Sequence, residues 1–128
     1  MNTDSVTLSP QLLAATEALA ANLHQSEPFV LYRQARDLLE ADAQAQALRR
    51  QLSEAQAEVR MRQARGEVTQ GDMDHLRTLH RVVQANRVIL DYARTQQFAV
   101  DYLREVNREI SELLGVDFAS LARRPGCC

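Results

Sequence analysis

Apolar residues recur every three or four positions along three stretches of this 128-residue chain, and each stretch is bounded by residues that start or stop helices. The first stretch follows Ser9-Pro10, in which Ser is a preferred N-cap and Pro is favoured at the first helical position. It ends near Gln25 and predicts a short N-terminal helix. Its apolar residues form one stripe: Leu8, Leu12, Ala15, Leu19 and Leu23.

The second stretch restarts at Ser26-Glu27-Pro28 and has no Gly and no further Pro from Phe29 to Arg65. This pattern predicts one long helix or two nearly collinear helices, because nothing else in it is a strong helix breaker. Asp42 is a residue type that can cap a restart, so we expect a kink there. A coiled-coil-like seam with alternating spacings of three and four runs through Ala45, Leu48, Leu52, Ala55 and Val59.

The third stretch, Asp72 to Leu114, follows a short turn that contains Gly66 and Gly71. Thr69 and Asp72 have the spacing of a capping box for the start of this helix. A glycine directly after the stretch is a C-cap signal for its end. The seam continues in Leu76, Leu79, Val83, Asn86, Leu90, Ala93, Gln97 and Val100.

Together the stretches predict an all-α fold: a short N-terminal helix and a long antiparallel helical hairpin, with limbs of about 55–60 Å at the usual helical rise. We expect kinks near Asp42 and Arg94. Residues 1–118 are expected to form a single domain, followed by a flexible tail at 119–128. Two helices cannot bury every apolar face of such a hairpin, so we expect self-association into a helical-bundle oligomer, a dimer or higher.

Several residues on these faces are candidate interface positions. Asn86 interrupts an otherwise apolar seam, where a polar side chain either pairs with its counterpart in a second chain or points to the seam edge and meets water. The few aromatic residues are interpreted as anchors where helices cross. The predicted interface set is Phe29, Tyr32, Leu48, Leu52, Val83, Asn86, Leu90, Phe98 and Tyr102.

Composition narrows the function further. No run approaches the roughly 20 apolar residues that span a bilayer, and no signal pattern is present, so we expect a cytoplasmic protein without a membrane role. The net charge is −2 and all fifteen basic residues are Arg interleaved with acidic residues, so no direct nucleic-acid binding is expected. The chain has no phosphate loop, no nucleophile elbow and no helical pair of metal-binding histidines, so we expect no enzymatic activity.

Cys127 and Cys128, the only cysteines, end the chain. Thiols at a chain end suit metal, cluster or redox chemistry better than packing. Zinc and iron–sulfur clusters usually take four thiolates, so the two in one chain are half a site and a second chain must supply the rest. From the residues alone, these thiols are ligands of a shared metal or cluster, a redox or zinc-sensing pair, or a tail without a role.

Several segments of the chain occur in a distinctive order, and the order resembles the YlbF/YmcA family of small helical bacterial regulators. The resemblance covers the chain from about Leu8 to Phe118. The segments that carry it are SEPFVLY at 26–32, DAQA at 42–45, NRVILDY at 86–92, DYLREVNREIS at 101–111 and LGVDFA at 114–119.

The resemblance implies an all-helical, non-enzymatic regulatory adaptor that is dimeric or higher. Family members form a complex with YaaT that influences competence, sporulation and biofilm formation, is associated with the endoribonuclease RNase Y and mRNA maturation, and carries iron–sulfur clusters through cysteines. Paralogous helical subunits, a YaaT-like protein and RNase Y are the implied partners. Cys127 and Cys128 are the implied ligands of a 4Fe-4S cluster shared between chains. The alternatives are a thiol or zinc redox sensor and a helical chaperone-like scaffold.

Overall fold

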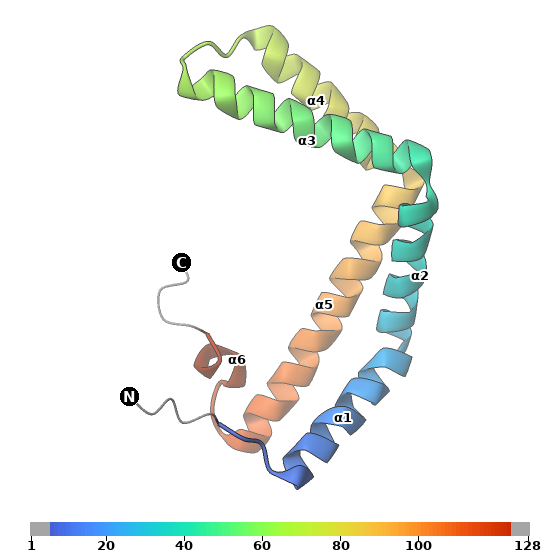
Figure 1. Cartoon of the computed structure of the whole chain (residues 1–128), viewed down its shortest axis with the longest axis vertical. Coiled ribbons are helices and arrows are strands. Elements are labelled where there is room, and N and C mark those ends of the chain that lie inside the picture. The colour runs from blue at the N-terminus through green and yellow to red at the C-terminus, as the bar shows by residue number, and fades with distance from the viewer. Residues whose placement is uncertain (1–5, 124–128) are drawn as a thin grey trace.

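A computed structural model of the chain describes residues 6–123, and all regular secondary structure in this range is helical (Figure 1). The predicted all-α fold, with a short N-terminal helix that precedes a helical hairpin, is confirmed. The elements are α1 (Pro10–Gln25), α2 (Glu27–Ala41), α3 (Ala43–Ala64), α4 (Gln70–Ala85), α5 (Arg87–Leu114) and α6 (Phe118–Leu121).

The hairpin is bent, because each of its limbs breaks at one residue. α2 gives way to α3 at Asp42, and α4 gives way to α5 at Asn86. α2 packs against α5 and α3 packs against α4, so the molecule consists of two helix pairs joined at a corner. Figure 1 shows the α3–α4 pair at a steep angle to the α2–α5 pair. The expectation of one helix, or two nearly collinear ones, across Asp42 was therefore wrong.

Both breaks are closed by a side-chain cap. The Asp42 carboxylate accepts a hydrogen bond from the backbone N–H of Ala45 at 2.8 Å, and the Asn86 side chain accepts one from that of Ile89 at 3.1 Å. Asp and Asn favour such caps because their short side chains satisfy N–H groups that the first helical turn leaves free. The kink near Asp42 is confirmed. The second bend lies at Asn86 and not near Arg94, through which α5 continues unbroken.

The most deeply buried residues stand at this corner. Leu39, just before the break in the first limb, is 2% exposed, and Ala45, just after it, is 0% exposed. The side-chain amide of Gln46 donates a hydrogen bond to the backbone carbonyl of Leu39 at 2.8 Å, so a carbonyl freed at the end of α2 is paired. Within residues 6–123 the fully buried set is small: Pro28, Ala35, Leu39, Ala45 and Ala99.

The turn that joins α3 to α4 is held by the predicted capping box. The Thr69 hydroxyl accepts a hydrogen bond from the backbone N–H of Asp72 at 3.1 Å, and the Asp72 carboxylate accepts one from that of Thr69 at 3.0 Å. Arg62 of α3 also bonds Asp72 at 2.8 Å and Glu58 at 2.7 Å. These contacts connect the end of α3 to the start of α4, so the turn keeps the two helices antiparallel.

Replacing Asn86 by Ala should weaken the corner. The variant loses the hydrogen bond to the first turn of α5, which costs about 1 kcal/mol of folding free energy. Thermal unfolding followed by circular dichroism should show a lower midpoint for Asn86→Ala and a near-native one for Asn86→Asp, which keeps a capping oxygen. Gln84→Ala, an exposed change in α4, is the control. Equal midpoints for Asn86→Ala and the control would show that the cap does not hold the bend.

The hairpin turn should lose stability in acid. The pKa of Asp72 lies below its usual 3.8 because its carboxylate accepts hydrogen bonds, first from the Thr69 backbone and also from Arg62. A lowered folded-state pKa means that the contribution is complete above pH 3.8 and is lost as the pH falls from there through the lowered pKa. The thermal midpoint should therefore drop over this range in the wild type and less so in Asp72→Asn. Asp74→Asn, which alters only exposed contacts with Arg77 and Gln70, should retain the wild-type pH dependence.

Candidate partner-binding surfaces

The chain exposes far more surface than a compact protein of its size. Its accessible surface is 10307 Å² for a mass of 14.4 kDa, whereas a compact monomer of that mass exposes about 6,800 Å². Two pairs of helices without a third layer leave one side of each pair uncovered. The exposed side chains include many large apolar ones, which in soluble proteins mark surfaces that other chains cover.

One large apolar recess is a groove between α1, the C-terminal end of α5 and α6. Its volume is about 380 Å³, and no lining residue is ionisable. Leu113, on its α5 wall, is 86% exposed. We call this recess the α1–α5 groove, and its lining is Leu12, Ala15, Thr16, Leu19, Ile110, Leu113, Leu114 and Phe118.

A second recess lies between α2 and α5, and it combines apolar and charged walls. Its volume is about 260 Å³. Leu38, at its edge, is 66% exposed, and Asp91 and Arg94 place opposite charges on the α5 side. Phe98 and Tyr102 extend this α5 face, because they follow Asp91 by seven and eleven positions, which is about two and three helical turns. We call the recess the α2–α5 pocket, and its lining is Leu31, Gln34, Ala35, Leu38, Val88, Asp91, Arg94 and Thr95.

The predicted interface residues fall into two groups. The side chains of Phe98 and Tyr102 are 46% and 37% exposed, so a partner protein can contact them. The others are half-buried, and they lie on helices that already pack against each other within the chain: Phe29, Tyr32, Leu48, Leu52, Val83, Asn86 and Leu90. Asn86 is the cap described above, so its place in an apolar seam reflects a helix start.

Tyr32 of α2 meets Tyr92 of α5 inside the chain. Their ring centroids are 5.6 Å apart and their hydroxyl oxygens lie 3.3 Å apart. The hydrogen bond to Tyr92, together with partial burial, raises the pKa of the Tyr32 phenol. Tyr32 therefore connects α2 to α5 within the chain. The sequence predicted it only as an aromatic anchor where helices cross.

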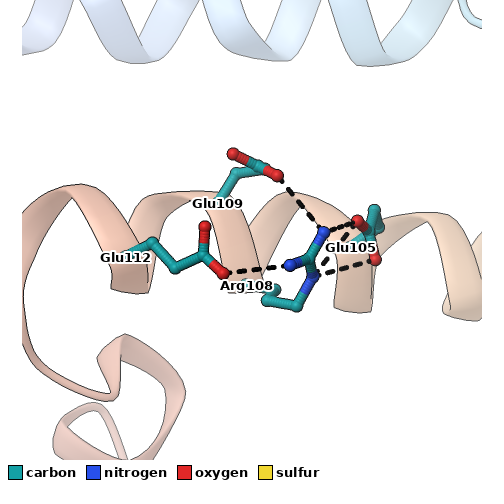
Figure 2. A network of polar contacts seen from close by, with 4 residues as sticks. All are labelled: Glu105, Arg108, Glu109 and Glu112. Atoms are coloured by element: carbon teal, nitrogen blue, oxygen red, sulfur yellow. Dashed lines mark hydrogen bonds and ion pairs between the residues drawn. The ribbon is translucent and has the colours of Figure 1, made fainter.

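One side of α5 carries a network of charges, shown in Figure 2. Arg108 bonds Glu105 three residues before it, Glu112 four residues after it at 2.9 Å, and the neighbouring Glu109. Arg108 thus joins three glutamates of the same helix. The pKa of Glu105 is lowered by its hydrogen bonds from Arg108, and that of Arg108 is raised, first by the hydrogen bond with Glu105. This face of α5 is satisfied in water and needs no partner.

The three histidines do not form a metal-binding group among the described residues. The His24 ring nitrogen Nδ1 accepts a hydrogen bond from Arg33 at 3.1 Å, and His80 lies 3.5 Å from the side-chain nitrogen of Gln56. Between residues 6 and 123, no three His, Cys, Asp or Glu side chains are grouped closely enough to hold a metal ion. Cys127 and Cys128 lie outside the described residues, so their proposed role as ligands stays a prediction. No helix of the described range is long and apolar enough to cross a membrane.

The sequence reasoning did not identify the two recesses as binding surfaces. For the α1–α5 groove a signal was present: α1 contains only one carboxylate, Glu17, and no Arg in sixteen residues. A helix on a water-facing surface normally carries more charge on its outer side. For the α2–α5 pocket no local signal existed, because Leu31 and Leu38 come together with Asp91 and Arg94 only through the packing of α2 on α5.

Comparison with known proteins places this arrangement in a family. A family model described as control of competence regulator ComK, YlbF/YmcA, matches residues 12–114, from the first turn of α1 to the end of α5. Two UPF0342 proteins from strains of Lactobacillus delbrueckii subsp. bulgaricus are each 27% identical over 106 residues, which cover 82% of this chain and 91% of the relative.

A solved structure has the same fold. It is a chain of the crystal structure of Bacillus subtilis RicA in complex with RicF, with a TM-score of 0.76 and 22% identity over 84% of this chain and 96% of that chain. The bent arrangement of helices is therefore also seen in an experimentally determined structure. With the match of the family model over most of its length, the chain belongs to the YlbF/YmcA family.

Proposed function

We propose that this protein is a non-enzymatic regulatory adaptor that acts by binding other protein chains, including further copies of itself. The observation that carries the proposal is the mismatch between its small buried core and its large exposed apolar surface. Membership in a family described as regulators of competence supports the regulatory part. The fold similarity to a chain crystallised as part of a complex between two proteins agrees with the binding part.

The α2–α5 pocket is the surface that best suits a different protein chain. It presents Leu31 and Leu38 beside Asp91 and Arg94, so it favours a partner helix with an apolar face and charges of complementary sign. Phe98 and Tyr102 extend the apolar contact along α5, and exposed aromatic side chains are common anchors in protein interfaces. A paralogous helical subunit of the same family fits this description.

The wider assembly in this proposal includes a YaaT-like protein and RNase Y, with mRNA maturation as the regulated process and competence, sporulation or biofilm formation as its outcome. The family resemblance supports these partners. The protein's own part is to present helix faces to these partners in the cytoplasm.

The C-terminal cysteines extend the proposal to a shared cluster. One chain supplies two thiolates, Cys127 and Cys128, and no other cysteine. A single chain therefore does not match the four-thiolate complement of a 4Fe-4S cluster, whereas two chains together do. When bound, such a cluster would make assembly dependent on iron and redox state. A zinc ion held by the same thiolates, as in a redox sensor, is the alternative.

Substitution in the α2–α5 pocket should abolish partner capture. Tagged protein purified from native cytoplasm should recover a paralogue of the family, identified by mass spectrometry, and Leu38→Asp should recover it at least tenfold less. The new carboxylate removes the apolar contact of Leu38 and loses its water in the complex, a cost that pairing with the nearby Arg94 offsets only in part. Met61→Asp places the same charge on an exposed apolar position of α3 and should leave recovery unchanged. Equal recovery by both variants would rule out this pocket as the binding surface.

The cluster is tested by anaerobic reconstitution with iron and sulfide. We expect visible absorbance bands and about four irons for every two chains in the wild type, and neither in the double variant Cys127→Ser, Cys128→Ser. Identical spectra for the two proteins would remove the cluster from the proposal. Zinc without sulfide in protein purified without reductant would favour the sensor.

A further inference from the structure

The outward side of α3 carries arginines that nothing within the chain neutralises. Arg49, Arg50 and Arg60 are exposed, and within residues 6–123 none of them forms an ion pair. At about 100° per residue, Arg49 and Arg60 lie roughly 20° apart around the helix, and Arg50 lies beside them. We call this side of α3 the α3 arginine face, and its exposed residues are Arg49, Arg50, Ser53, Ala57, Arg60 and Ala64.

The carboxylates of the same helix lie toward α4. Glu54 and Glu58 line a recess between α3 and α4 together with His75. Glu58 also bonds Arg62 at 2.7 Å, so its charge is already paired. Acidic and basic residues that alternate along the sequence are thus separated by the packing of α3 on α4, and the arginine face keeps an uncompensated positive charge.

One end of the arginine face is hollowed. A recess of about 390 Å³ is lined by Gln46, Arg49 and Arg50. The side-chain amide of Gln46 is occupied by the backbone carbonyl of Leu39, so the two guanidinium groups are the donors that remain available there. A guanidinium donates two parallel hydrogen bonds to the two oxygens of a carboxylate. The recess therefore suits the carboxylate of a bound chain.

The spacing of the face suits a helix. Arg49 and Arg60 are eleven residues apart, which is about 16 Å along α3. Ser53 and Ala57 lie between them, and such small side chains allow a second helix to approach to the usual 8–10 Å between axes. A helix with carboxylates repeated three or four positions apart along one side would therefore meet all three arginines.

We infer that the α3 arginine face binds an acidic helix of a different protein, whose carboxylates pair with Arg49, Arg50 and Arg60. The inference rests on the proposed function, in which the protein is an adaptor for other chains. It adds a second binding surface on the α3–α4 pair, apart from the α2–α5 pocket, and it names the chemistry of the partner. Charge complementarity of this kind favours the correct partner and speeds its association.

The composition of the α3–α4 pair favours an acidic protein over RNA. Residues 43–86 contain no Phe, Tyr or Trp, so they offer no ring on which bases could stack, as single-stranded RNA sites do. Seven arginines and five carboxylates leave this segment only slightly positive, whereas binding along a phosphate backbone needs a strongly basic stripe. Three arginines on one helix face are enough to match the carboxylates of one partner helix.

The test is photo-crosslinking of the full-length chain in native cytoplasmic extract, with Ala64 at the end of the face replaced by p-benzoylphenylalanine. Mass spectrometry should identify adducts with a segment of another protein that carries at least three Asp or Glu residues at helical spacing. The yield should fall as salt is raised, because exposed ion pairs are screened. A synthetic peptide of that segment should bind the purified chain, and its version with Gln for Glu and Asn for Asp should not.

Two matched variants locate the contact. The triple variant Arg49→Gln, Arg50→Gln, Arg60→Gln should give at least tenfold less adduct, because three exposed ion pairs together contribute about 1.4 kcal/mol or more. It should keep its helix content by circular dichroism, since these side chains form no ion pair within the described range and Gln favours helices. The control removes the same charge from exposed positions elsewhere and should crosslink like the parent: Arg81→Gln, Arg104→Gln, Arg123→Gln.

Several results would overturn the inference: no adduct, an adduct removed by ribonuclease, a captured segment without the acidic row, a segment of a second copy, or equal yields from the two triple variants. Recovery of the paralogue through the α2–α5 pocket is measured separately and should not change in the arginine variant. If the paralogue is recovered but the acidic segment is not, the inference falls and the proposed function stands. If the adduct depends on the arginines but paralogue recovery does not depend on Leu38, the inference stands and the α2–α5 pocket falls.

Discussion

The breaks at Asp42 and Asn86 lie at the same corner of the molecule, and the arrangement of every other element follows from their agreement. Each break interrupts one limb of the hairpin, and each is closed by one short polar side chain that bonds the next helical turn. A break in one limb alone would separate the limbs, since a straight helix cannot follow a bent one along its length. Because both limbs bend together, α2 stays against α5 and α3 stays against α4.

The bent hairpin is stabilised by a narrow core. Leu39 and Ala45 are enclosed at the corner, and small side chains such as Ala35 and Ala99 let α2 and α5 approach closely. Small side chains bury little area, so each contributes little hydrophobic free energy. Two helix pairs meeting at an angle also have no third layer to cover their outer sides. An architecture of two helix pairs without a third layer therefore leaves apolar surface that other chains can bury.

The uncovered surfaces differ in charge, and this difference suits them to different partners. The α1–α5 groove has no ionisable lining residue, whereas the α2–α5 pocket carries opposite charges beside its leucines. In the proposed function, Cys127 and Cys128 also require another chain, because two thiolates are half of a usual cluster site. The exposed apolar surface and the proposed cluster ligands thus both favour the proposal that this protein acts in an assembly.

The positions of most helix ends were determined by the sequence itself, because caps act within one turn. Ser9, Asp42 and Thr69 bond N–H groups three residues ahead, and the positive φ of Gly115 ends α5, so neighbouring residues decide these ends wherever the helices pack. Asn86 was also present as a capping residue, but the apolar spacing around it matched a continuous helix, and only tertiary packing selected the bend. The exposure of α1 and the meeting of Leu38 with Arg94 likewise depend on how distant helices are placed. Local hydrogen bonds can be predicted from neighbouring residues, so the helices and the fold class were predictable. Burial is decided by residues far apart in the sequence, so the binding surfaces were not.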